Sequence, residues 1–217
     1  MPFEIQPDTI QTPHPHAPGI VVVSGPGGSP WLTDPAKPHL GGNFDGGDLG
    51  TMYPHDLWPW LISTFGVKTM VDVGCGTGET AAWFFDRDIE AVGIDGLEFN
   101  VSRCKTAAIL HDFQDGPCVF GPVDLIWCAD VAEHIEEKYV GNLIRTLTQC
   151  RVLAMCQGTD KHPDGWHHVN NQPEQYWVDL LAAAGMVEDV ESTRASRAIA
   201  WGGWWKVSGR IYRRKAG

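Results

Sequence analysis

A glycine-rich turn between two apolar segments constrains the fold of this chain more than any other feature. The segment Val71-Asp72-Val73-Gly74-Cys75-Gly76-Thr77-Gly78-Glu79 stands where a short apolar strand ends and a helix begins. Glycines in such a turn supply positive φ angles and let a ligand lie against the backbone, which a Cβ atom would block. The turn therefore predicts a doubly wound α/β fold with a ligand site at the end of its first strand.

Strand and helix patterns alternate from residue 55 to the C-terminus and predict a single α/β domain over 55–217. Short, almost continuously apolar runs indicate parallel strands covered on both faces, near 69–73, 90–95, 108–111, 123–128 and 151–156. Two further strands, near 186–192 and 204–213, follow each other without a helix and predict an antiparallel edge hairpin. Helices are predicted near 78–86, 98–107, 134–149 and 173–184. The expected architecture is a Rossmann-like, mostly parallel seven-stranded sheet with helices on both faces.

Residues 1–54 are rich in proline and glycine and are predicted to form an N-terminal arm outside the core. The stretch from Gly41 to Tyr53 directly precedes the domain and contains a Gly-Gly pair that can act as a hinge. We therefore expect this part of the arm to close over the ligand site as a lid.

Composition narrows the class of protein and its partners. The formal net charge of −11 disfavours a chain that tracks nucleic acid through clustered basic residues, and DNA is not expected as a partner. The six cysteines form no C-x-x-C pair, and the N-terminus does not resemble a signal peptide, so a cytoplasmic location is expected. No apolar run approaches the roughly 18 residues of a membrane span. The oligomeric state stays open.

A second carboxylate indicates which ligand the glycine turn binds. Asp95 ends the second predicted strand, 21 residues after Gly74, where a ribose can offer it both hydroxyls. Glu79 stands where a dinucleotide fingerprint has glycine or alanine, and Asp72 would repel a pyrophosphate. S-adenosylmethionine instead carries a sulfonium and an ammonium group, which favour a nearby carboxylate. These residues favour S-adenosylmethionine over a nicotinamide dinucleotide.

The same segments resemble the motifs of class I S-adenosylmethionine-dependent methyltransferases. The glycine turn is similar to their motif I, Val92–Gly96 to motif II, His111-Asp112-Phe113 to motif III, and Glu133-His134-Ile135 to a helix start common in small-molecule members. The resemblance implies S-adenosylmethionine as the cofactor. It places Asp72 and Gly74 at the amino-acid end of the donor, Asp95 at the ribose, and Asp112 with Phe113 at the adenine. The remaining donor-binding residues that it implies are Cys75, Gly76, Gly78 and Gly96.

Residues for the methyl acceptor are expected in the loops after the fourth and fifth strands, because ligands bind beyond the carboxyl ends of parallel strands. Methyl transfer to a hydroxyl needs a base, and histidine titrates near neutral pH. We predict O-methylation of a small polar, sugar-like acceptor with His167 or His168 as base, and with His134 and Asp130 next in line. Aromatic residues that can support the acceptor, or merely pack, are Trp166, Trp201, Trp204 and Trp205.

Other functions stay open at this point. A metal-assisted reaction with Asp130, His167 and Asn170 as ligands is conceivable, although no spacing in the sequence indicates a metal site and none is predicted. An RNA or protein acceptor, or a non-catalytic module that binds S-adenosylmethionine, are the alternatives. The D/N/S-P-P-Y/F/W motif of DNA amino-methyltransferases is absent after the fourth strand, where Cys128-Ala129-Asp130-Val131 stands.

Overall fold

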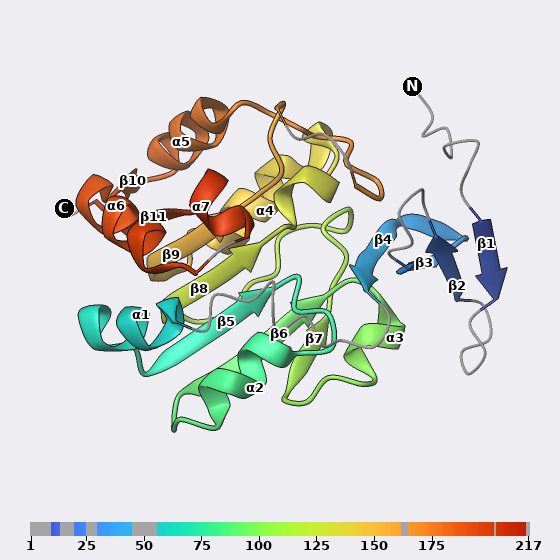
Figure 1. Cartoon of the computed structure of the whole chain (residues 1–217), viewed down its shortest axis with the longest axis horizontal. Coiled ribbons are helices and arrows are strands. Elements are labelled where there is room, and N and C mark those ends of the chain that lie inside the picture. The colour runs from blue at the N-terminus through green and yellow to red at the C-terminus, as the bar shows by residue number, and fades with distance from the viewer. Residues whose placement is uncertain are drawn as a thin grey trace.

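Two β-sheets organise the protein (Figure 1). The computed structural model describes residues 10–13, 20–24, 30–44, 56–161, 165–201 and 203–215. The larger sheet has seven strands in the order β10-β11-β9-β8-β5-β6-β7. Its strands are β5 Thr69–Val73, β6 Glu90–Asp95, β7 Ala108–Leu110, β8 Val123–Ala129, β9 Cys150–Cys156, β10 Met186–Glu188 and β11 Arg210–Arg214. The five strands β9, β8, β5, β6 and β7 are parallel to one another, whereas β11 pairs antiparallel with both of its neighbours, β9 and β10. This arrangement confirms the predicted fold class.

Alternating side chains of the central strands pack into two separate cores. In β5, Val71 and Val73 face a core that includes α4 Val140–Leu147 and α5 Glu174–Ala183. Met70 points the other way, toward α1 Leu57–Phe65 and α2 Glu79–Phe85. Because both faces are covered, the middle residues of β6, β8 and β9 are apolar or glycine, and the carboxyl edge of the sheet is left for a ligand. Among the described residues, no helix is long and apolar enough to cross a bilayer.

The connection between the two edge strands differs from the prediction. They pair antiparallel as expected, but α6 Val190–Ile199 and α7 Trp204–Ser208 lie between them. The Asp189 carboxylate accepts a hydrogen bond of 3.0 Å from the Ser192 amide and so caps α6, which ends the predicted strand 186–192 at residue 188. The predicted strand 204–213 begins only at Arg210, because the aromatic residues before it belong to α7.

Two predicted helices are shorter than expected. The helix predicted over 98–107 is α3, Glu98–Val101, because the backbone after it turns back to the glycine loop, where the Lys105 amide donates to Thr77 at 3.1 Å. The helix predicted over 134–149 is α4, which begins at Val140. Two 3-10 turns precede it, η1 Ala132–His134 and η2 Glu137–Tyr139, and they place the side chains after β8 at the edge of the sheet.

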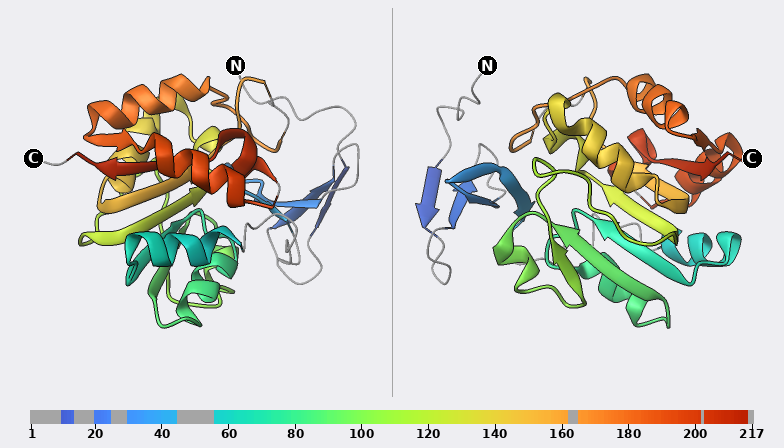
Figure 2. Two further views of the ribbon diagram at one scale, coloured as in Figure 1. Left: turned by 60° about the vertical axis from the view of Figure 1, so that its left-hand side comes forward. Right: turned by 180° about the vertical axis from the view of Figure 1, so that it is seen from behind.

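A small antiparallel sheet, which the sequence did not predict, occupies the N-terminal region. It has the order β1-β2-β3-β4, with β1 Ile10–Pro13, β2 Val21–Ser24, β3 Pro30–Asp34 and β4 Lys37–Phe44. Figures 1 and 2 show it beyond the carboxyl ends of the parallel strands, next to the loops that follow β6 and β7. Leu40 of β4 packs there: a Cβ atom added to Gly96 would lie 2.5 Å from its Cδ2 atom. The predicted lid falls partly outside the described residues, which end at 44 on this side.

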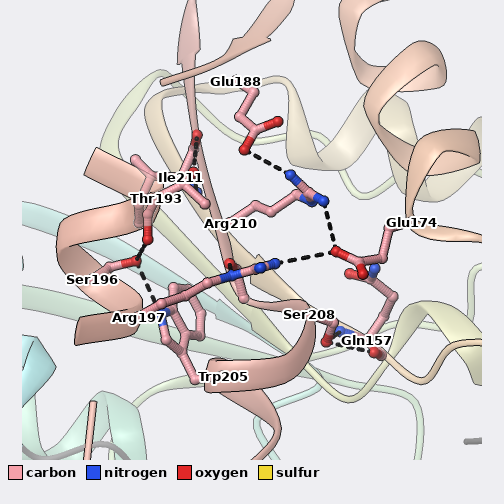
Figure 3. Close-up of polar contacts among 11 residues, drawn as sticks. Gln157, Glu174, Glu188, Thr193, Ser196, Arg197, Trp205, Ser208, Arg210 and Ile211 are labelled. Atoms are coloured by element: carbon pink, nitrogen blue, oxygen red, sulfur yellow. Dashed lines mark hydrogen bonds and ion pairs between the residues drawn. The ribbon is translucent and has the colours of Figure 1, made fainter. Parts of the chain in front are cut away.

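An ion-pair network fastens the antiparallel edge to α5 (Figure 3). The Glu174 carboxylate accepts hydrogen bonds from Arg210 at 2.6 Å and from Arg197 at 3.1 Å, and Arg210 also donates to Glu188 at 2.7 Å. All four side chains are less than a third exposed. The network therefore joins α5, α6, β10 and β11, and Glu174 is shared by two of its three ion pairs.

Replacing Glu174 by glutamine is expected to lower the free energy of unfolding by about 1–2 kcal/mol near neutral pH, since charge-assisted hydrogen bonds to two arginines are weakened. Burial raises the pKa of Glu174, but Arg210 and Arg197 outweigh burial, and the net pKa lies below the ordinary value of 4.5. The stabilisation is therefore present above about pH 4.5 and is lost as the pH falls through the lower pKa of the folded state. Urea unfolding of both proteins at several pH values measures this difference, with Glu191→Gln on α6 as the control. An equal difference at all pH values would contradict the prediction.

Candidate active site

A cavity of about 390 Å³ opens at the carboxyl edge of the large sheet. Its wall combines the glycine turn after β5, the ends of β6 and β8, the loops after β7 and β9, and strands β3 and β4 of the small sheet. The predicted donor and acceptor residues therefore meet in one space, to which the N-terminal region also contributes.

The glycine turn is shaped by close contacts that exclude a side chain. The amides of Gly74 and Cys75 donate to the Ile94 carbonyl at 2.8 and 3.0 Å, which fixes the turn against β6. Gly74 has a φ of 73°, and a Cβ atom there would lie 2.2 Å from Cγ2 of Val131. Gly78 has a φ of 79°, and its Cβ would lie 2.2 Å from Sγ of Cys104. Both positions need glycine for conformation and for space.

Asp95 lines the cavity, and hydrogen bonds hold its carboxylate in place. One carboxylate oxygen accepts from the Gly76 amide at 2.9 Å, and the other accepts from the Leu97 amide at 2.8 Å and the Asn100 side chain at 3.0 Å. Burial raises the pKa of Asp95, and these three hydrogen bonds oppose the rise. The carboxylate is thus held in one orientation beside the glycine turn, as a ribose-binding residue requires.

The predicted adenine residues also line the cavity, and they have a partner from the small sheet. Phe113 is buried, and Asn142 donates to its carbonyl at 2.7 Å. The Asp112 carboxylate pairs with Nε2 of His39 at 2.8 Å and accepts from the Gln114 amide at 2.9 Å. Burial opposes ionisation of Asp112, but these hydrogen bonds outweigh it and lower its pKa. His39 lies in the arm, and nothing in the sequence indicated its role.

Asp72 is a buried carboxyl group on the cavity wall, with only 3% of its surface exposed. Burial, followed by the negative charges of Cys104 and Asp95, raises its pKa to about 8. A carboxyl group in this setting becomes an anion most readily when a cation binds beside it. The position therefore suits the positively charged end of a ligand.

Four titratable side chains from the segments after β8 and β9 gather on the cavity wall. Asp130, Glu133, His134 and His168 all line its wall, and the two imidazole rings lie edge to face with centroids 4.8 Å apart. Burial raises the pKa of Asp130 to about 6, while burial and the Asp130 charge raise that of Glu133 to about 8. Burial, followed by the charges of His168 and His167, lowers the pKa of His134 to about 3. We call these four residues the acceptor cluster.

Other predicted acceptor residues take different positions. His167 is buried with a φ of 52°, and it is not part of the described cavity wall. Asn170 is buried as well, and its side-chain oxygen accepts from Gln172 at 3.0 Å. Of the tryptophans, Trp166 and Trp204 lie on the wall, whereas Trp201 is 73% exposed and outside it.

Trp205 touches the cavity but belongs mainly to the core. Its ring stacks on Trp127 with centroids 4.8 Å apart and an interplanar angle of 11°. Its indole nitrogen donates to the Ser196 hydroxyl at 3.1 Å (Figure 3). Packing of α7 on the sheet, and not contact with a ligand, accounts for this residue.

Comparisons with known proteins agree with this arrangement. Residues 71–153 match the family described as a methyltransferase domain. The plantazolicin methyltransferase BpumL, solved with S-adenosylhomocysteine, has a TM-score of 0.55 at 11% identity over 75% of this chain and 83% of its own. Magnesium protoporphyrin IX methyltransferase from Synechocystis PCC 6803 has a TM-score of 0.51 at 16% identity, and the match covers 73% of this chain and 76% of that enzyme. The [4+2]-cyclase SpnF has a TM-score of 0.51 at 17% identity, and the match covers 75% of this chain and 81% of the cyclase.

The matched region contains the glycine turn, Asp95 and the first three residues of the acceptor cluster, so this part of the chain is similar to a methyltransferase domain. S-adenosylmethionine is the methyl donor that such a domain and the sequence motifs imply.

Donor binding is expected to release a proton from Asp72 below about pH 8, because the cationic donor favours the ionised carboxylate. The apparent affinity for S-adenosylmethionine should therefore rise with pH toward 8, by at most about tenfold per pH unit. Calorimetry in buffers of different ionisation enthalpy counts the released protons. The proton balance of Asp72→Asn under the same conditions isolates the contribution of this residue, and an identical balance in both proteins would refute the prediction.

Proposed function

We propose that this protein transfers the methyl group of S-adenosylmethionine to a hydroxyl oxygen of a small polar, sugar-like acceptor. The observation that carries the proposal is one cavity whose wall contains both predicted donor-binding residues and the acceptor cluster. A compact ligand bound at the acceptor cluster would lie beside the sulfonium end of the donor, near Asp72 and Gly74. Proximity of this kind supplies much of the rate enhancement in a displacement reaction.

Besides the two substrates, the proposed reaction needs a group on the protein that accepts the hydroxyl proton. The hydroxyl oxygen attacks the methyl carbon while the carbon–sulfur bond breaks, and the bonding electrons pass to sulfur to give S-adenosylhomocysteine. The hydroxyl proton passes to the protein. Of the predicted bases, Asp130 and His168 are the candidates on the wall, because burial lowers the pKa of His134 to about 3, which makes that ring a poor base.

Cavity size and lining support a small acceptor. The volume of about 390 Å³ must hold the donor as well, so a folded protein or an RNA helix could enter only with an extruded group. The aromatic faces of Trp166 and Trp204 can support a sugar ring. The structural neighbours are named for plantazolicin, magnesium protoporphyrin IX and a [4+2] cyclisation, so the shared fold alone does not determine the acceptor.

The proposal is tested by incubating the protein with S-adenosylmethionine labelled in its methyl group and with extract separated by size into small molecules, RNA and protein. We expect label in the small-molecule fraction, as an ether that survives mild base. The Asp95→Ala variant, which is expected to lose the donor, serves as the control. Label in the RNA or protein fraction would overturn the small acceptor, and absence of label from every fraction would favour a non-catalytic donor-binding module.

A further inference from the structure

Three members of the acceptor cluster have the composition of a metal site. Glu133, His134 and His168 each place a potential ligand atom, one carboxylate oxygen and two imidazole nitrogens, within 4.8 Å of one another. Two of them come from the turn after β8 and one from the loop after β9, so the fold and not the sequence spacing assembles them.

Two of these ligand atoms are buried without a protein partner. Glu133 is only 1% exposed, and one of its oxygens accepts from the Gly158 amide at 2.6 Å. Its other oxygen, and Nδ1 of His134, have no hydrogen-bond partner among the described residues. A buried polar atom without a hydrogen-bond partner is unfavourable in the folded protein. One cation placed between these two atoms would satisfy both.

The surroundings hold the ligands in place. The ring of His134 has a hydrogen bond with the backbone of Trp166, and metal-ligating histidines are usually oriented by such a bond. Gly42 of β4 lies directly over this ring, since a Cβ atom there would be 2.9 Å from its Cε1 atom. A Cβ atom at Gly165 would likewise lie 2.2 Å from Nε2 of His168. Backbone from two distant segments thus covers both imidazoles.

We propose that Glu133, His134 and His168 bind a divalent transition-metal ion at the acceptor end of the cavity. Two imidazoles with one carboxylate suit zinc, iron, cobalt or manganese, whereas magnesium prefers oxygen ligands. Three protein ligands leave coordination positions open toward the cavity. An acceptor with two adjacent oxygens, such as a vicinal diol or an α-hydroxy acid, would occupy two of them.

This inference rests on the proposed function and assigns roles within it. The ion would bind the acceptor oxygen and favour its deprotonation, as a Lewis acid does. With His168 as a ligand, the proton passes to Asp130, the oxygen attacks the methyl carbon, and the electrons of the carbon–sulfur bond pass to sulfur. Asp130 lies on the same wall and is not one of the three ligands.

The test is a titration of chelator-treated protein with Co²⁺, followed by its visible absorption. We expect one equivalent to bind, and we expect Glu133→Gln and His168→Asn each to weaken binding at least about 100-fold. His167→Asn is the matched control. This position has a positive φ angle, which asparagine tolerates, and the variant should bind Co²⁺ like the wild type. Binding of S-adenosylhomocysteine to each variant confirms that it is folded.

The metal site and the methyl transfer can fail separately. A wild-type protein that binds S-adenosylhomocysteine but no Co²⁺ would overturn the site, as would unchanged Co²⁺ binding in Glu133→Gln and His168→Asn. Full transfer to a small acceptor by chelator-treated protein would refute the catalytic role of the ion and leave the proposed function intact. Co²⁺ binding as predicted, with label only in RNA or protein, would support the site and refute the small acceptor.

Discussion

The Asp95→Ala variant is expected to bind S-adenosylhomocysteine about 10 to 150 times more weakly than the wild type, a loss of about 1.5–3 kcal/mol. The carboxylate is the predicted acceptor for both ribose hydroxyls, and it also holds the Gly76 amide, so its removal disturbs the turn as well as the ligand. The Leu97 amide and the Asn100 side chain lose their partner at the same time. Calorimetry with the purified variant measures the change.

Glu98→Gln provides the matched control for this measurement. Glu98 is exposed, lies three residues after Asp95 and begins α3, so its replacement changes the local charge by the same amount and removes none of the three hydrogen bonds. We expect its affinity to stay within about twofold of the wild type. Unchanged affinity of a folded Asp95→Ala variant would refute the assignment of the ribose site.

His168→Asn is expected to lower turnover by about 10²–10⁴ once an acceptor is known, while binding of S-adenosylhomocysteine is retained. The prediction holds whether His168 is the base or a metal ligand, because in both roles it promotes deprotonation of the acceptor. His168 lies on the cavity wall and takes no part in the hydrogen bonds that hold Asp95, so its replacement leaves that carboxylate in place. Steady-state kinetics and calorimetry on the same preparation separate the two effects.

The neighbouring residue tests the alternative that the sequence left open. His167 is outside the described wall, and we expect His167→Asn to lower turnover by less than about tenfold. A large loss in His167→Asn together with a small loss in His168→Asn would show that the base is His167, contrary to the placement of the two rings in the structure.

The donor half of the site was predictable because its signals are local or lie on adjacent strands. The positive φ angles of Gly74 and Gly78 follow from a turn within one short segment. Asp95 ends the strand that pairs directly with β5, so the spacing of two apolar runs was enough to bring it to the glycine turn.

The acceptor half depends on contacts that sequence spacing does not encode. Glu133 is oriented by the amide of Gly158. In the donor half, the contact of His39 with Asp112 across 73 positions of the chain was missed for the same reason. The helices between β10 and β11 were missed for a related reason, because an aromatic segment with Trp204 and Trp205 fits a half-buried strand as well as a short helix. The stacking of Trp205 on Trp127 and its hydrogen bond to Ser196 select the helix.

Strand β4 contacts residues of both predicted subsites, since Leu40 packs at Gly96 beside the donor residues and Gly42 covers His134 in the acceptor cluster. A shift of this strand that accommodates one ligand must change the surroundings of the other. Thermodynamic linkage then requires that the donor and the acceptor alter each other's dissociation constants by the same factor. The two substrates are therefore expected to bind with heterotropic cooperativity, and its sign depends on whether the position of β4 set by the first ligand also fits the second.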